Sequence, residues 1–241
     1  MSSAAFKQII SALTLLSACS SAAAESFSWP IGCVPGINCS GWQFRIGYPD
    51  IERAGRSSKC GPPGYPGHLG TDIVVSAVDQ MVPVLAAADG IVRWVEDGKF
   101  DRCPNDSQGD CDDRTRSRLP LADGETASLG FNAGNYAVIE HIRPDGRFLT
   151  LYAHLRSGSL SVLPGALVVR GQQIATVGSS GNSQVPHLHF GVYRQSGSSY
   201  TPIDPWRGPC NTAQPDGLWE SEPPYQKLYA RIKSHSGANA P

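Results

Sequence analysis

The chain has 241 residues, 40% of them hydrophobic, and a formal net charge of −1 at pH 7. That apolar fraction suits a globular core, and the length allows one large domain or two small ones. Because the charge is near zero and no run of Lys or Arg occurs, a nucleic-acid partner held by electrostatics is excluded.

The N-terminus is typical of an export signal, which we place at residues 1–24. Lys7 provides a positive charge, and the apolar stretch IISALTLLSA that follows is too short to span a bilayer. Two alternative cleavage sites are possible for this signal. LSAC resembles a bacterial lipobox, in which Cys19 would carry a lipid anchor, whereas AAA before Glu25 fits ordinary cleavage, which we favour. We expect a protein of the periplasm or cell envelope, or a secreted one, with membrane contact only through such an anchor.

The cysteine count supports export. Seven cysteines are present, and six remain once Cys19 is assigned to the signal. An even number predicts three disulfides in an oxidising compartment, although six cysteines allow 15 pairings. We predict two sequence-local pairs and the long-range pair that they leave: Cys33–Cys39, Cys103–Cys111 and Cys60–Cys210. The chain has no C-x-x-C pair, which argues against a zinc site made of cysteines.

Short apolar runs separated by turn signals follow an ordered Gly-, Pro- and Cys-rich arm at residues 25–42. The turn signals include ADG and RPDG. The chain holds 26 Gly and 19 Pro, and helical periodicity is almost absent, so we predict a mainly β single domain. The expected strands lie at 42–48, 71–77, 81–97, 135–142, 147–155, 165–178 and 187–194.

Two polar segments interrupt or end this pattern. Residues 98–130 are acidic in their middle and contain Cys103 and Cys111, and we interpret them as a surface insertion that forms a solvated loop. Calcium binding there is a weaker alternative, because the carboxylate spacing does not match an EF-hand loop. Residues 211–241 are predicted to form an irregular C-terminal tail, with His235 as an ordinary surface residue.

Two histidines lie two positions apart in VPHLHFGV, residues 185–192. Side chains at i and i+2 of a strand point to the same face. His187 and His189 therefore share one face, and Leu188 and Phe190 share the other. Because the apolar pair faces the core, the histidine pair is expected to face a cleft or a metal ion.

Other segments supply three further candidates. In GHLGTDIVV, His68 and Asp72 share a face of an extended chain, and Gly70 leaves room between them. LYAHL adds His154. Catalytic zinc needs three N or O ligands and an open position for water, with a base and an oxyanion donor nearby. The five candidates provide three ligands and two further histidines. Strand geometry does not say which histidines are ligands and which are not.

Three segments, HLGTD, YAHL and GSSGNSQVPHLHF, resemble the signature motifs of lysostaphin-type (LytM-like) zinc endopeptidases. The resemblance covers roughly residues 43–205, apart from the insertion, and rests on several ordered motifs. It implies a twisted antiparallel β-sheet with a loop-walled active-site groove, in a domain that we place at 43–210.

The resemblance also implies the role of each candidate. It implies one Zn²⁺ per chain, held by His68, Asp72 and His189. His154 and His187 match the family's catalytic histidines, which would orient or deprotonate the zinc-bound water and stabilise the tetrahedral intermediate. The implied substrate is a peptide stem or cross-link of peptidoglycan; the sequence does not indicate an oligomeric state.

Two other functions stay open. The chain could be a non-catalytic module that binds cell wall or activates another hydrolase, although such members typically lack a zinc ligand. It could also be an extracellular protease that degrades proteins, because loops around the groove determine the substrate. Gly191 stands where many relatives carry an acidic residue. This position is not a ligand, so the difference affects the surroundings of the metal and not its binding.

Overall fold

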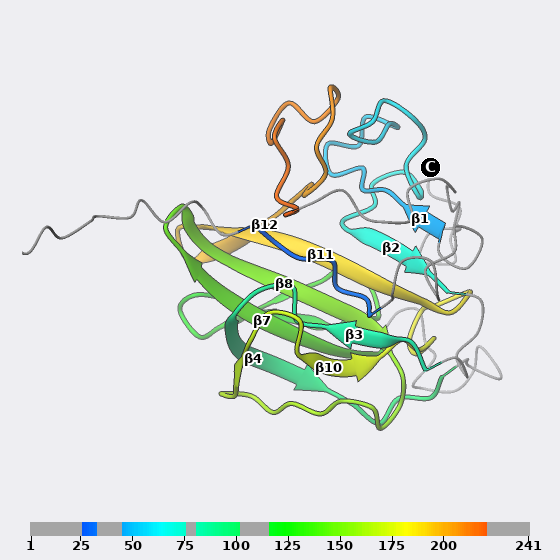
Figure 1. The fold of residues 1–241 in the computed structure, drawn as a ribbon, viewed down its shortest axis with the longest axis vertical. Coiled ribbons are helices and arrows are strands. Elements are labelled where there is room, and N and C mark those ends of the chain that lie inside the picture. The colour runs from blue at the N-terminus through cyan, green and yellow to red at the C-terminus, as the bar shows by residue number, and fades with distance from the viewer. Residues whose placement is uncertain (1–25, 33–44, 76–80, 102–115, 221–241) are drawn as a thin grey trace, which may run out of the picture.

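The computed structural model describes residues 26–32, 45–75, 81–101 and 116–220, and the ordered elements in these ranges are all β-strands (Figure 1). None of the described residues belongs to a helix that could cross a membrane. The predicted export signal lies outside them. The strands are β1 (Arg45–Gly47), β2 (Thr71–Val74), β3 (Pro83–Leu85), β4 (Gly90–Glu96), β5 (Arg118–Pro120), β6 (Thr126–Ser128), β7 (Asn135–Arg143), β8 (Gly146–Leu155), β9 (Leu167–Val168), β10 (Gln173–Thr176), β11 (His187–Ser196) and β12 (Ser199–Ile203).

One antiparallel sheet of eight strands organises the molecule, which confirms the predicted mainly β class. Its order is β1-β2-β11-β8-β7-β4-β9, and β12 pairs with β11. Two-stranded sheets, β10-β3 and β5-β6, complete the arrangement. The long strands β7, β8 and β11 lie side by side at the centre (Figure 1). Every predicted strand segment contains at least one observed strand, whereas β5, β6 and β12 were not predicted.

Apolar side chains pack on both faces of the sheet, so most residues of the central strands β7, β8 and β11 are buried. Along β8, Phe148 and Tyr152 join one core cluster, and Leu149 and Leu151 join the other. This is the period-two alternation of a strand with two covered faces. Leu188 and Phe190 of β11 join the first cluster and are fully buried, as their alternation with the two histidines predicts.

The second half of the insertion is part of the fold, which corrects the solvated-loop interpretation for residues 116–130. Strands β5 and β6 form a hairpin in which Arg118 pairs with Ser128. Leu119 and Leu129 are buried in the second core cluster. The signal for this hairpin was the sequence ADG at residues 122–124, which is typical of a turn. Residues 102–115, where calcium was considered, lie outside the described residues.

The described part of the N-terminal arm, residues 26–32, packs across the sheet and pairs with the chain's last described segment. Phe27 forms a parallel bridge with Trp219, and Ile31 bridges Val84 of β3. The ring of Trp29 lies 5.2 Å from that of Trp219 and 5.8 Å from that of Trp206. Residues 211–220 carry no strand, as predicted for the tail, but this aromatic contact holds them to the core. His235 lies outside the described residues.

Cys60 and Cys210 form a disulfide, which confirms the predicted long-range pair. It joins the loop before β2 to the segment after β12. The two predicted local pairs, Cys33–Cys39 and Cys103–Cys111, lie outside the described residues.

Removing this disulfide is expected to destabilise the chain. The bond closes a loop across a sequence separation of 150 residues, so it strongly restricts the unfolded chain. Replacing both Cys60 and Cys210 by Ser should lower the free energy of unfolding by about 2–5 kcal/mol. Urea denaturation of oxidised variant and oxidised wild type measures the difference, and equal midpoints would contradict the prediction.

Candidate metal centre

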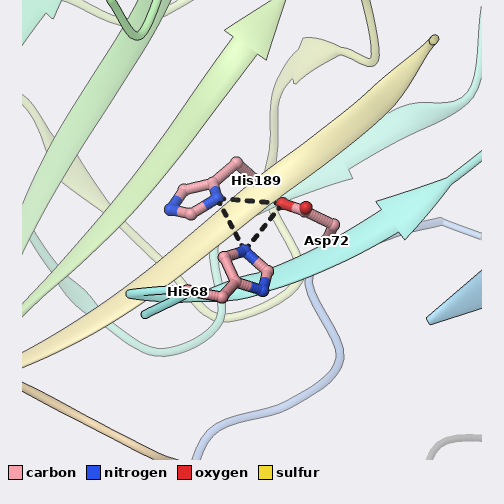
Figure 2. A group of neighbouring side chains, drawn as sticks. All are labelled: His68, Asp72 and His189. Atoms are coloured by element: carbon pink, nitrogen blue, oxygen red, sulfur yellow. Dashed lines mark hydrogen bonds and ion pairs between the residues drawn. The ribbon is translucent and has the colours of Figure 1, made fainter. Parts of the chain in front are cut away.

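Three side chains, two from neighbouring strands and one from the segment before them, converge at one point (Figure 2). Asp72 of β2 lies directly opposite His189 of β11 in the antiparallel register, and His68 lies just before β2. The Nδ1 of His189 is 2.9 Å from the Oδ1 of Asp72 and 3.3 Å from the Nε2 of His68. The Nε2 of His68 is 3.1 Å from the same carboxylate oxygen. All three side chains have 0% exposure.

The spacing of these three atoms fits a tetrahedral zinc ion. Bonds of about 2.0–2.1 Å from zinc to nitrogen or oxygen place neighbouring ligand atoms about 3.3 Å apart in a tetrahedron. The observed separations of 2.9, 3.1 and 3.3 Å are close to that value. Two imidazoles and one carboxylate are also a ligand set of the kind used by catalytic zinc. Across the described ranges, no other trio of His, Cys, Asp or Glu is arranged to hold a metal ion.

The neighbours of His68 fix the orientation of its ring. Its Nδ1 lies 3.0 Å from the carbonyl oxygen of Tyr48. A hydrogen on Nδ1 that donates to this carbonyl leaves the Nε2 lone pair directed at the centre, as a metal ligand requires. The ring of Tyr65 stacks on that of His68, with centroids 4.2 Å apart. The histidine is therefore held in a ligand-ready orientation by the backbone and by an aromatic neighbour.

Gly70 is required by the close approach of β2 and β11. A Cβ at this position would lie 2.7 Å from the Nε2 of His189 and 2.7 Å from the carbonyl oxygen of Phe190. Any side chain there would push His189 away from Asp72. We expected Gly70 to leave room between His68 and Asp72; the groups nearest to its missing side chain are instead the ring of His189 and the backbone of Phe190.

The electrostatics of the centre favour the protonation states that bind metal. Burial by itself would raise the pKa of Asp72, but the neighbouring imidazoles of His68 and His187 and hydrogen bonds from His189 and His68 hold the pKa of this carboxyl well below its usual range. Burial lowers the pKa of His189, against the opposing effect of Asp72. A carboxylate and a neutral imidazole are the forms that coordinate zinc.

Zinc affinity and the stability of the zinc-free chain are both expected to fall as the pH drops. Because the pKa of His189 is lowered in the folded chain, below about pH 6.5 this residue binds a proton more readily in the unfolded chain, which destabilises the fold. The lowered pKa of Asp72 removes further stability below about pH 3.9, as the pH approaches its folded value. Zinc titrations at about pH 7.5 and about pH 5.5 should differ by about tenfold or more in affinity; equal affinities would contradict the prediction.

Two more histidines lie beside the three converging residues. The Nε2 of His187 is 3.6 Å from the Oδ1 of Asp72, and the ring of His154 lies 4.6 Å from that of His187. The Nδ1 of His187 lies 2.7 Å from the carbonyl oxygen of Val185, and that of His154 lies 2.8 Å from the carbonyl oxygen of Ser180. Each Nδ1 can donate its hydrogen to a carbonyl, which makes Nε2 the proton acceptor of the neutral ring.

His154 reaches the site through an unusual backbone conformation. Its neighbour Ala153 pairs with His189 across β8 and β11, while Tyr152 points to the first core cluster. Strict alternation would turn His154 to the side of Tyr152. Instead, its φ is 60°, in a region that residues other than glycine rarely adopt. This local turn brings the ring to His187, and strained backbone of this kind is concentrated at functional sites.

Phe131, which the sequence did not identify, covers the centre. Its ring lies 5.0 Å from that of His189 and 6.0 Å from that of His154, and it follows the unpredicted hairpin. A second missed residue, Tyr193, lies on the face of β11 that carries His189. A Cβ on Gly191 would lie 2.8 Å from the Cε2 of Tyr193, so this ring fills the space beside Gly191. Neither residue belongs to a motif, so no local signal marked them.

Comparisons with known proteins agree with the motifs. Residues 120–205 match the sequence model of Peptidase family M23, so the resemblance is confirmed over a range that includes His154, His187 and His189. The peptidoglycan DD-endopeptidase ShyB of Vibrio cholerae is 48% identical over 60 residues, which cover 25% of this chain and 13% of that protein. The chain thus spans a small part of that relative.

Solved structures show weaker similarity. A zinc-containing peptidase from Vibrio cholerae is 24% identical with a TM-score of 0.42, over 75% of this chain and 39% of the other. The catalytic domain of lysostaphin from Staphylococcus simulans is also 24% identical, with a TM-score of 0.40, over 67% of this chain and 89% of the other.

Proposed function

We propose that this chain, of which residues 120–205 match Peptidase family M23, is a zinc-dependent endopeptidase that hydrolyses peptide bonds in peptidoglycan stems or cross-links. One observation carries the proposal: the donor atoms of His68, Asp72 and His189 converge at distances of 2.9–3.3 Å. Two further histidines beside them complete the groups that hydrolysis requires. The proposed place of action is outside the cytoplasm, where peptidoglycan lies.

The three converging residues would hold the ion, with Nε2 of His68, Oδ1 of Asp72 and Nδ1 of His189 as ligand atoms. Bound zinc supplies a Lewis acid that polarises the scissile carbonyl and lowers the pKa of a coordinated water to about 7. The carbonyl of Tyr48 keeps the tautomer of His68 that this requires.

His154 and His187 would handle the protons. Each neutral ring offers Nε2 as an acceptor because its Nδ1 lies 2.8 or 2.7 Å from a backbone carbonyl. A ring that takes the proton of the attacking water becomes a cation and can then donate that proton to the leaving amine. The imidazolium of His187 would be stabilised by Asp72, whose Oδ1 is 3.6 Å away. Phe131 packs beside these groups, with its ring 6.0 Å from that of His154 and 5.0 Å from that of His189.

Digestion of purified peptidoglycan tests the proposal. Zinc-loaded wild type should release new peptides whose masses identify one bond cut, and His187→Ala should release about 10²–10⁴ times less. Chelation should abolish release, and added zinc should restore it. Wild type that still releases nothing after zinc is supplied would favour the non-catalytic module that binds cell wall or activates a hydrolase. Cleavage of an unfolded protein but not of peptidoglycan would favour the extracellular protease.

A further inference from the structure

One short segment, residues 178–180, joins the two histidines that are proposed to carry protons. The N–H of Gly178 donates to the carbonyl of His154 at 3.1 Å, and the carbonyl of Gly178 accepts the N–H of His187 at 3.2 Å. Two residues further on, the carbonyl oxygen of Ser180 lies 2.8 Å from the Nδ1 of His154. The position of this segment therefore determines which ring nitrogen of His154 carries the hydrogen.

A carboxylate outside the zinc-peptidase motifs holds this segment in place. Asp101 lies near the start of the predicted insertion, and its Oδ1 accepts the backbone N–H of Ser179 at 3.0 Å. Its Oδ2 accepts the backbone N–H of Ser157 at 2.9 Å. Asp101 also forms an isolated antiparallel bridge with Ser180. One residue thus joins the turn after β8 to segment 178–180.

Close packing keeps the carboxylate of Asp101 against the segment. A Cβ on Gly178 would lie 2.5 Å from the Oδ1 of Asp101 and 2.4 Å from the backbone nitrogen of Arg156. Ser180 is buried, and its Oγ donates to the carbonyl of Leu155 at 2.7 Å. Hydrogen bonds from N–H groups to a carboxylate are roughly twice as strong as neutral ones. Removal of this carboxylate is therefore expected to let the segment shift.

We propose that Asp101 is a positioning residue for the proposed hydrolysis, on which this inference rests. By holding segment 178–180, it makes the carbonyl of Ser180 keep the hydrogen of His154 on Nδ1, which leaves Nε2 as the proton acceptor. The carboxylate of Asp101 acts through the backbone and not on the substrate. A shift of about 1 Å in a catalytic group can cost about a hundredfold in rate, so the effect on hydrolysis is large enough to measure.

Asp97 offers a matched control close by in the chain. Its Oδ1 accepts the backbone N–H of Gly158 at 3.0 Å and that of Gly98 at 2.7 Å. It therefore braces the same turn after β8 that Asp101 contacts, but its hydrogen bonds to other described residues do not reach segment 178–180. Loss of either carboxylate should loosen the turn, whereas only loss of Asp101 should disturb the two histidines.

Kinetics of the zinc-loaded full chain on a peptide substrate give the first test. Asp101→Ala should lower kcat by about 10–100 times, while KM changes by less than about twofold and the zinc content stays the same. Asp101→Asn keeps one oxygen as an acceptor, so its loss of kcat should be smaller. Asp97→Ala should keep kcat within about twofold of wild type.

Nitrogen chemical shifts of the imidazole rings give a second test that needs no substrate. In the zinc-free full chain at about pH 8, where an ordinary histidine is neutral, His154 should carry its hydrogen on Nδ1 in wild type and in Asp97→Ala. In Asp101→Ala its two nitrogen signals should move toward each other, because the tautomer with the hydrogen on Nε2 becomes populated. The signals of His141, which segment 178–180 does not hold, should stay the same in all three proteins.

Three results would overturn the proposal. The first is a kcat within about twofold of wild type in folded Asp101→Ala. The second is an equal loss of kcat in Asp97→Ala, which would indicate only a general bracing of the turn. The third is loss of zinc from Asp101→Ala, or an unchanged tautomer of its His154.

Two other outcomes leave the test decisive. If Asp101→Ala fails to fold, the same measurements on Asp101→Asn decide. If wild type hydrolyses no peptide, the proposed function fails, and the comparison of His154 tautomers still shows whether Asp101 controls this ring.

Discussion

Zinc content is expected to fall from about one ion per chain in wild type to near zero in His189→Ala. The imidazole of His189 contributes one of three converging donor atoms, 2.9 Å from the Oδ1 of Asp72. Its loss leaves two ligands, and a two-ligand site does not hold zinc through dialysis at neutral pH. Metal analysis of dialysed protein, by mass spectrometry, measures the change. Hydrolysis should be lost in parallel.

A matched control is available in the same sheet. His141 is also buried, and its ring bonds the carbonyl of Asp89 at 2.8 Å and the hydroxyl of Thr150 at 2.7 Å, away from the centre. His141→Gln should keep its zinc even if it lowers stability. Comparable zinc in His189→Ala and wild type would refute the ligand assignment. Loss of zinc from both variants would indicate general unfolding, which thermal denaturation detects.

Hydrolysis is expected to fall by about 10²–10⁴ in His187→Ala and in His154→Ala while zinc stays bound. Both rings lie next to the centre, but neither supplies one of the three converging donor atoms. Removing either ring takes away a proton acceptor and leaves the ligand atoms in place. The rate constant kcat on a peptide substrate and the zinc content of the same sample measure the two effects separately.

The double variant sharpens this prediction. If His154 and His187 act in one proton-transfer sequence, replacing both should cost little more than replacing one. If the loss of kcat in the double variant equals the product of the losses in the two single variants, the two histidines have independent roles. Loss of zinc from His187→Ala would contradict its assignment as a proton carrier and make it a fourth ligand. Unchanged kcat in both single variants would remove both from the reaction.

Strand periodicity predicted which residues share a face, because it is local, and the resemblance to lysostaphin-type endopeptidases implied their roles. Alternation placed His187 and His189 on the face opposite Leu188 and Phe190, and those apolar residues do lie in the core. The same argument placed His68 and Asp72 together around Gly70. It did not place His154: the resemblance identified this residue in YAHL, but its φ of 60° departs from strand geometry and was not predicted.

The missed elements are those whose role depends on distant packing. Residues 116–130 look polar in sequence, yet Leu119 and Leu129 are buried because the hairpin folds back onto the sheet. Phe131 follows that hairpin in the chain, and the fold of the hairpin places its ring beside the site. A local pattern describes which face of an element is apolar, but it does not say which surface that face will meet.

The amino-acid sequence by itself determined which residue types could hold zinc, which faces of their strands they occupy and that the fold is built of β-strands. Only the tertiary structure decided that Asp72 lies opposite His189, across 117 residues of sequence. The physical reason is that side-chain direction follows from backbone geometry within a few residues. Register and long-range pairing follow from the packing of the whole core, which no short segment encodes.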